Sequence, residues 1–498
     1  MSTQSKKVLV IGAGFAGMSA ASFLAKKGWS VTVIEKNTLP GGRARKFKAE
    51  GFTFDMGPSW YWMPDIFEKY FANFGKKVSD YYQLQRLDPS YRVYFEKAAW
   101  DMPANYEELQ ALLESVEPGA AKALDLFLAE AKFKYDIGVG KLVQQPGLSL
   151  TEFLDIDLFK GIFKLDVFQS MKKHVAKYFK HPYIQFLMEF PVLFLGALPE
   201  KTPALYSLMN YADIKGGTWY PENGMYSIVQ AMYDLAISLG VQFHLGEEVT
   251  NIKVVNGQAR QVSTKLVDKE EVRTYDFDVI VGAGDYHHIE TKLLDTEHQS
   301  YSEKYWDTRV MAPSSLLYYV GLNKKIPGVL HHSLFFDTDF EVHGKEIYTD
   351  PKWPTRPLFY ASVPSVTDPT VAPEGCENLF LLIPIAAGLE GDTEAVRTHY
   401  FNEIIGRLEK KWGVSIMDSI IYKRSYAVSD FKSDYHSFKG NAYGLANTLL
   451  QTANLKPSCK SKKIKNLYYA GQLTVPGPGV PPSLISGEVV ANLINKNN

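Results

Sequence analysis

The chain has 498 residues and a net charge of −1, so it is long enough for two or three domains and offers no basic surface for nucleic acid. Its two cysteines, Cys376 and Cys459, exclude a disulfide framework and a cysteine-based zinc site and fit a reducing cytoplasm. The polar N-terminus and the lack of a long apolar run predict neither a signal peptide nor a transmembrane helix. Aromatic residues make up 13% of the chain, which suits either a large apolar ligand or an aromatic core.

The first 35 residues predict a strand, a glycine-rich turn, a helix and a second strand. Val8–Ile11 is an unbroken apolar run, as in a central parallel strand buried on both faces. In the turn, Gly12 permits the tight bend, Gly14 leaves room for a pyrophosphate, and Gly17 allows close packing of helix and strand. The pyrophosphate would lie at the helix N-terminus. Glu35 ends the second strand, where a carboxylate can bind both hydroxyls of an adenosine ribose.

The residues after Glu35 favour FAD over NAD. Gly41 and Gly42 let the backbone pass close to a cofactor, and Arg43 offers a forked donor to the pyrophosphate. The run continues with Gly51, Phe54, Asp55, Gly57 and Pro58. It resembles the N-terminal signature of the FAD oxidoreductases that include amine oxidases and carotenoid desaturases.

Residues 60–215 carry an aromatic cluster and then a mostly helical pattern. The cluster Trp60–Met63 suits either a substrate channel or the joint between two domains. Further along, 160–179 alternates lysines with apolar residues, and 183–198 is apolar with a break at Pro191. Together, 160–179 and 183–198 suit either a membrane-surface element or buried core helices with a solvated lysine face.

The second half returns to strands. The sequence predicts a strand at 241–245 in the nucleotide domain and a further strand at 278–284 that joins its parallel sheet. Strands at 316–322, 358–363 and 379–385 predict an antiparallel substrate domain with a helix at 395–411. Two histidine pairs lack metal-ligand spacing: His287–His288 and His331–His332. We interpret them as polar surface or packing residues, and no metal site is predicted.

The tail predicts a return to the cofactor. A strand near Leu467 leads to Gly471 and Gln472, and a proline- and glycine-rich run, 476–482, follows. Ser483 is expected to cap a final helix over 484–494, whose N-terminus can stabilise negative charge on a reduced flavin.

With both ends of the site in view, the chain resembles the bacterial-type carotenoid desaturases of the phytoene desaturase family, most closely the carotenoid 3,4-desaturases. The tail motif and the stretch Asp368–Gly375 carry this finer resemblance, and Gln472 replaces the acidic residue of many other FAD enzymes. The resemblance implies an α/β fold: an FAD-binding Rossmann-like (GR2-type) domain, an antiparallel-sheet substrate domain and a helical, membrane-facing cap. The expected segments are 1–70, 216–295 and 436–498 for the FAD domain, 71–215 for the cap and 296–435 for the sheet domain.

The residues expected to bind FAD combine those argued above with positions that the resemblance supplies. They are Gly12, Gly14, Phe15, Ala16, Gly17, Glu35, Lys36, Gly42, Arg43, Gly57, Pro58, Ser59, Val249, Gly284, Gly471, Gln472, Gly479, Val480 and Pro481. The Val249 backbone is implied to contact the adenine.

The family implies oxidation of a carotenoid C–C single bond, with an allylic hydride passing to flavin N5 and a proton leaving the neighbouring carbon. No general base is predicted. Expected partners are the carotenoid, a peripheral membrane surface, and quinone or oxygen as electron acceptor, in a protein of the cytoplasm attached to the inner membrane. The alternatives are a phytoene- or lycopene-type desaturase, a carotenoid isomerase, an amine oxidase, and a prenyl-protein binding module without flavin chemistry.

Overall fold

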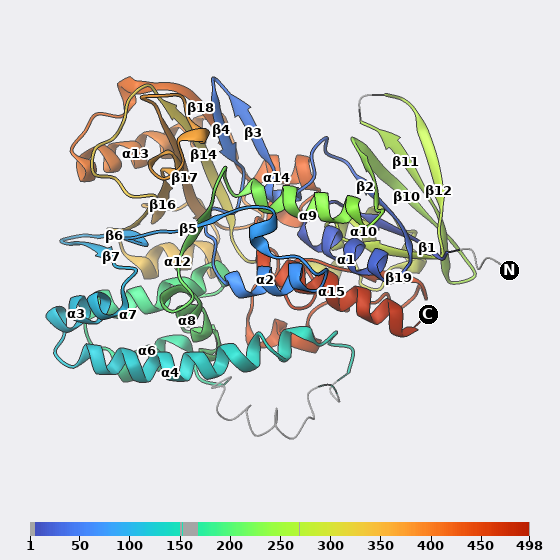
Figure 1. The fold of residues 1–498 in the computed structure, drawn as a ribbon, viewed down its shortest axis with the longest axis horizontal. Helices are drawn as coiled ribbons and strands as arrows, with labels where there is room; N and C mark the ends of the chain where they lie inside the picture. The colour runs from blue at the N-terminus through green and yellow to red at the C-terminus, as the bar shows by residue number, and fades with distance from the viewer. Residues whose placement is uncertain (1–4, 150–151, 153–167, 268, 498) are drawn as a thin grey trace.

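The computed structural model describes residues 5–149, 152, 168–267 and 269–497, and all structural statements concern these residues. Three regions pack around one another: a parallel sheet with its helices, a larger sheet, and a cap of helices (Figure 1). Both termini lie on the side of the parallel sheet, away from the larger sheet.

A five-stranded parallel sheet forms the nucleotide-binding region. In spatial order its strands are β19 (Leu467–Tyr469), β13 (Val279–Gly282), β1 (Lys7–Ile11), β2 (Ser30–Glu35) and β9 (Gln242–Leu245). The apolar side chains of β1 and β13 are buried on both faces, as a central parallel strand requires. The sheet therefore joins stretches from the beginning, middle and end of the chain, which confirms the predicted Rossmann-like fold.

Helix α1 (Phe15–Lys26) packs against both α9 (Tyr226–Ser238) and α15 (Val480–Asn497). A Cβ atom at Gly487 would lie 2.4 Å from the carbonyl oxygen of Ala16, so only glycine permits this approach of α15 to α1. The Ser19 hydroxyl also donates to the Leu484 carbonyl at 2.7 Å. The last helix is thus anchored on the first.

Helix α15 begins earlier than predicted. It starts at Val480, and the Ser483 N–H donates to the Gly479 carbonyl, so Ser483 lies inside the first turn and does not cap the helix. Pro481 and Pro482 are tolerated there because the first helical residues need no N–H partner.

The larger sheet has seven strands. In spatial order they are β18 (Ile420–Tyr426), β14 (Ser314–Leu322), β17 (Glu377–Ile385), β16 (Phe359–Ser362), β15 (His332–Phe336), β6 (Tyr91–Phe95) and β7 (Ala99–Met102). Helix α13 (Glu394–Trp412) covers one face, and the other face turns toward the nucleotide-binding region. The predicted strands and helix are confirmed, but the sheet is not wholly antiparallel, because β6 pairs in parallel with β15.

The 71–215 segment is less helical than expected. It supplies β6 and β7 to the large sheet, and β5 (Leu84–Arg86) pairs with β8 (Trp219–Pro221). Alternation of buried Tyr91, Val93 and Phe95 explains β6. The cap helices are α3 (Tyr106–Val116), α4 (Ala120–Gly138), α6 (Met171–Tyr178), α7 (Pro182–Glu189) and α8 (Leu208–Ile214).

The membrane-surface interpretation of 160–198 is not supported where the structure describes it. Residues 160–167, including Lys164, lie outside the described part. The apolar faces of α6 and α7 are buried in the core, and Lys172 pairs with Glu200 at 2.6 Å and Glu341 at 2.7 Å. These helices match the buried-core alternative. None of the described helices is long and apolar enough to cross a bilayer.

The remaining elements surround these regions. They are β3 (Lys46–Ala49) with β4 (Phe52–Asp55), the antiparallel sheet of β10 (Glu247–Val255), β11 (Gln258–Leu266) and β12 (Val272–Asp276), and helices α2 (Pro64–Ala72), α10 (Tyr286–Lys292), α11 (Glu303–Asp307), α12 (Phe340–Tyr348) and α14 (Val428–Tyr435).

Candidate active site

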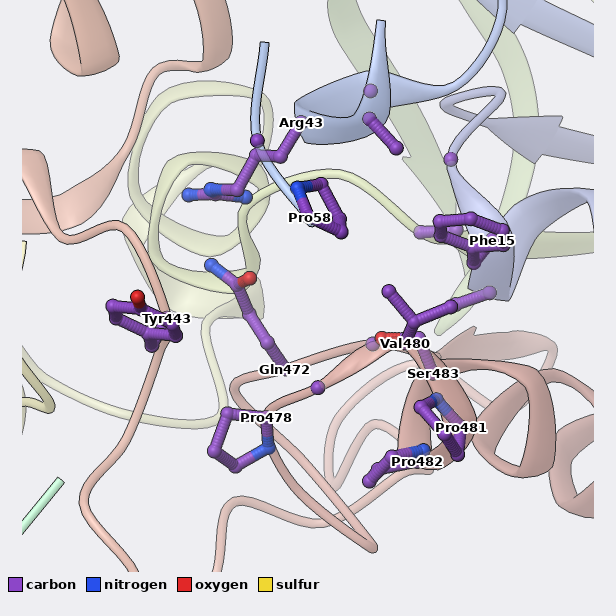
Figure 2. Close-up of a pocket in the computed structure, with 18 of the residues that line it drawn as sticks. Phe15, Arg43, Pro58, Tyr443, Gln472, Pro478, Val480, Pro481, Pro482 and Ser483 are labelled. Atoms are coloured by element: carbon purple, nitrogen blue, oxygen red, sulfur yellow. The ribbon is translucent and has the colours of Figure 1, made fainter. Parts of the chain in front are cut away.

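A cavity of about 780 Å³ runs from the carboxyl ends of the parallel strands to the inner face of the large sheet and the cap. All predicted cofactor residues except Gly17 line it; Figure 2 shows several of them converging from the N- and C-terminal parts of the chain. These residues share one cavity. Direct contact of each residue with the cofactor is a prediction.

The three glycines of the first turn have separate structural reasons. Gly12 has φ +101°, and a Cβ there would lie 3.2 Å from the backbone of Ala283. A Cβ at Gly17 would lie 2.0 Å from the Gly12 carbonyl oxygen, so Gly17 serves helix–strand packing and stays outside the cavity. A Cβ at Gly14 would meet no protein atom within 4 Å. Gly14 therefore keeps open the space in front of the α1 N-terminus, which has no side-chain cap.

Glu35 is buried and held in place by three donors. The Ala13 N–H donates to Oε2 at 2.8 Å, and the Asn37 backbone N–H and side-chain amide donate to Oε1 at 2.8 and 2.7 Å. These bonds orient the carboxylate in the cavity wall. Each carboxylate oxygen can accept more than one hydrogen bond, which suits it to receive hydroxyl donors as well.

Arg43 and Gln472 both donate hydrogen bonds to Asn441. Arg43 Nη2 donates to the Asn441 carbonyl at 3.2 Å, and Gln472 Nε2 donates to the Asn441 side-chain oxygen at 3.1 Å. Figure 2 shows the Arg43 and Gln472 side chains in the same part of the cavity. Burial lowers the pKa of Arg43, and its Nε has no partner among the described residues. A buried, partly unpaired guanidinium in a cavity wall is matched to an anionic ligand.

Beyond Glu35 the cavity ends in a polar cluster. His288 stacks on His436 with ring centroids 4.0 Å apart, and His436 Nε2 lies 2.5 Å from Glu248 Oε1. Burial lowers the pKa of His288 to about 3, so its ring is neutral. Lys36 and Val249 complete this end of the cavity. His288 was expected to be a packing or surface residue, and no sequence signal linked it to His436.

The rest of the cavity is mainly apolar. Trp60–Met63 lines it, and Trp60 also stacks on His332 of the large sheet at 4.2 Å, so the cluster is both a cavity wall and a domain joint. His331 and His332 are buried, in agreement with a packing role. The lining residues that sequence reasoning missed come from the cap, the large sheet and a loop after α14: Val139, Leu142, Val143, Leu205, Leu208, Met209, Ser315, Leu317, Tyr360, Leu382 and, in the loop, Tyr443. The predicted strands located the sheet residues, but only the structure shows which sheet face borders the cofactor residues.

Fold and site together define a flavin-dependent oxidoreductase. The family model for flavin containing amine oxidoreductases matches residues 15–495. Among solved structures, a redesigned putrescine oxidase superposes with a TM-score of 0.61 at 12% identity, covering 99% of each chain, which shows a shared fold.

Two curated relatives identify the group within that class. A carotenoid 3,4-desaturase of Haloarcula japonica is 40% identical over 98% of this chain and 97% of its own length. A zeta-carotene-forming phytoene desaturase of Myxococcus xanthus is 32% identical over 98% of this chain and 94% of its own length. The chain therefore belongs to the carotenoid desaturases of the flavin containing amine oxidoreductase family.

FAD is the cofactor of this enzyme, and the residues described above fit it. The open space at Gly14 and the uncapped α1 N-terminus suit the pyrophosphate, and Arg43, with its unpaired Nε, lines the same cavity. The Glu35 carboxylate would receive the ribose hydroxyls, as the sequence predicts. Because the chain belongs to this enzyme family, the alternative of a prenyl-protein binding module is set aside.

Proposed function

We propose that this enzyme converts a C–C single bond of a carotenoid into a trans double bond, at the 3,4 position of an acyclic end that bears a tertiary hydroxyl, as in 1'-hydroxy-γ-carotene. The observation that carries the proposal is a single cavity in which the cofactor residues continue into a long apolar space. The 3,4 position draws its support from the name of the Haloarcula japonica relative.

When bound, FAD supplies the oxidising power by accepting a hydride from an allylic carbon of the polyene. The chain itself provides an apolar channel that holds the polyene and excludes water. Trp60, Trp62 and Met63 form one wall, and Leu205, Leu208 and Met209 of the cap lie in another. Such side chains bury an extended hydrocarbon and leave a delocalised cation no water to react with.

The carboxylates that line the cavity belong to its cofactor end. Glu35, Glu247 and Glu248 lie near the predicted ribose and adenine positions, and Asp285 and Asp434 lie near Arg43 and Arg45. No described carboxylate lines the wall formed by the cap, so we assign no side chain as the base that removes the proton.

The cavity also supports peripheral attachment to the cytoplasmic face of the inner membrane, since a carotenoid arrives from lipid. Thr452 and Asn454 line the cavity, and two neighbouring leucines are exposed: Leu450 by 76% and Leu455 by 49%. Exposed apolar side chains at a cavity mouth favour contact with a bilayer. The electron acceptor in this proposal is quinone or oxygen.

The test supplies the FAD-loaded enzyme in liposomes with phytoene, lycopene, γ-carotene or 1'-hydroxy-γ-carotene and a quinone. We expect a red-shifted product that has lost two hydrogens from the hydroxylated substrate. Conversion of phytoene alone would instead place the enzyme with the phytoene desaturases. An isomerised product of unchanged mass would contradict the dehydrogenation.

A further inference from the structure

The inner face of the large sheet places hydroxyl groups in an otherwise apolar part of the cavity. The strand register sets Leu317 beside Leu382 and Leu382 beside Tyr360 across β14, β17 and β16. Ser315 lies two residues before Leu317 and shares its face of β14. The loops around the cavity add Ser59 and Tyr443. We call Ser59, Ser315, Tyr360 and Tyr443 the hydroxyl cluster.

The pKa shifts of the two tyrosines agree with the placement of these hydroxyls around one cavity. Burial raises the pKa of Tyr360, Ser59 opposes that shift by hydrogen bonding, and Tyr443 adds to it. Burial also raises the pKa of Tyr443 to about 12, and the Ser315 hydroxyl opposes the rise. The four residues thus form one polar patch on the cavity wall.

Ser315 is the member whose hydrogen bonding is incomplete. Its side chain is 1% exposed, and although its hydroxyl lies near Tyr443, it has no partner of hydrogen-bonding geometry among the described residues. A buried hydroxyl left without a partner is costly, and the cost is removed when a ligand supplies one. An unsubstituted polyene offers no such atom, whereas an alcohol does.

A buried histidine of the large sheet holds the Tyr360 hydroxyl. The hydroxyl lies 2.6 Å from Nδ1 of His332, and burial keeps the pKa of His332 well below its usual value, so the ring is neutral. Trp60, stacked on His332, fixes this arrangement.

We infer that the hydroxyl cluster binds an alcohol group of the substrate, and that this contact sets how far the polyene slides past the cofactor. An alcohol both donates and accepts, so it can supply the partner that the Ser315 hydroxyl lacks among the described residues. The inference rests on the proposed function and deepens it: the cluster selects a hydroxylated end and thereby selects the bond that is oxidised.

The experiment compares 1'-hydroxy-γ-carotene with the same carotenoid lacking the hydroxyl, using FAD-loaded protein in liposomes. Binding is followed by quenching of tryptophan fluorescence, and turnover by product mass. In Ser315→Ala and in Tyr443→Phe we expect affinity and kcat/KM for the hydroxylated compound to fall about threefold to tenfold, with the other compound unaffected. The oxidised position should also become mixed.

Ser333→Ala is the matched control. Ser333 is a 1% exposed serine of β15 whose hydroxyl also lacks a described partner, but it does not line the cavity. It should leave the preference for the hydroxylated compound unchanged. Equal losses for both compounds in Ser315→Ala and Tyr443→Phe would overturn the inference, as would a loss of FAD affinity in these variants without a loss of the preference. A parent enzyme that binds both compounds equally would overturn it too. A parent that prefers the alcohol in binding yet oxidises another bond would contradict only the proposed 3,4 position.

Discussion

Arg43 and Ser437 are joined by a hydrogen bond of 2.9 Å from the guanidinium Nη2 to the serine hydroxyl, although they lie 394 positions apart in the chain. The bond ties the glycine-rich loop after β2 to the loop after α14. The guanidinium also lies over the ring of Tyr435, 5.2 Å from its centroid. Arg43 is therefore preorganised by the distant part of the chain, with Nε left for a ligand.

The first prediction concerns that preorganisation. Arg43→Lys keeps the charge but loses the fork, so we expect FAD to bind about tenfold more weakly and Arg43→Ala to bind it more weakly still. Titration of the apoprotein with FAD, followed by flavin fluorescence, measures both. Unchanged affinity in Arg43→Ala would remove Arg43 from the pyrophosphate site.

Alanine substitutions at Gly14 and Gly17 should separate an effect on cofactor binding from an effect on packing. An alanine at Gly14 meets no protein atom, so Gly14→Ala should fold normally and lose FAD affinity by about tenfold or more. An alanine at Gly17 would overlap the Gly12 carbonyl, so Gly17→Ala should lower the free energy of unfolding by at least about 1–3 kcal/mol. Thermal unfolding of the apoproteins checks the second effect; equal stability of the two variants would contradict it.

Glu35 should contribute to FAD affinity through its hydrogen bonds to the ribose. Glu35→Ala removes charge-assisted bonds worth roughly 1.5–3 kcal/mol each, and it also frees the Ala13 N–H and the Asn37 amide. Glu35→Gln is the milder control, because it keeps one acceptor. The dissociation constant of FAD is the measurement, and a Glu35→Ala protein that binds FAD like the parent would show that the ribose lies elsewhere.

The exposed leucines near the cavity mouth should mediate membrane attachment. We expect Leu450→Ser with Leu455→Ser to reduce flotation with liposomes, because each loses roughly 1.5–3 kcal/mol of apolar burial in the bilayer. Leu126→Ser is the control, since Leu126 is 55% exposed but lies on α4 and does not adjoin Thr452 or Asn454. Equal flotation of all the variants would argue against this surface.

Lys456 should make stability depend on pH. Its side chain is buried beside the Asn447 side-chain oxygen at 3.0 Å, and burial lowers its pKa from 10.5 to about 7. Between these values the unfolded chain binds a proton that the folded protein does not, so the free energy of unfolding should rise with pH from about 7 to 10. Denaturant unfolding at several pH values should show a smaller slope in Lys456→Met. An identical slope in both proteins would mean that Lys456 stays charged when folded.

The nucleotide-binding fold and the order of its parts could be predicted from local sequence patterns. Unbroken apolar runs at β1 and β13 and the spacing of Gly12, Gly14 and Gly17 are local patterns, and each has a local physical cause. The predicted cofactor residues also came from such patterns and from family resemblance, and all of them except Gly17 line one cavity.

Which residues from separate elements meet depends on how the elements pack in three dimensions. The position of β6 beside β15, the stack of Trp60 on His332 and the hydroxyl cluster depend on strand order and register, which no short stretch encodes. The same holds for α6 and α7: their amphipathic sequence suits either a membrane or a core, and the structure buries their apolar faces against other elements. Helix α15 starts at Val480, before the predicted cap at Ser483, because Pro481 and Pro482 are compatible with the first turn of a helix.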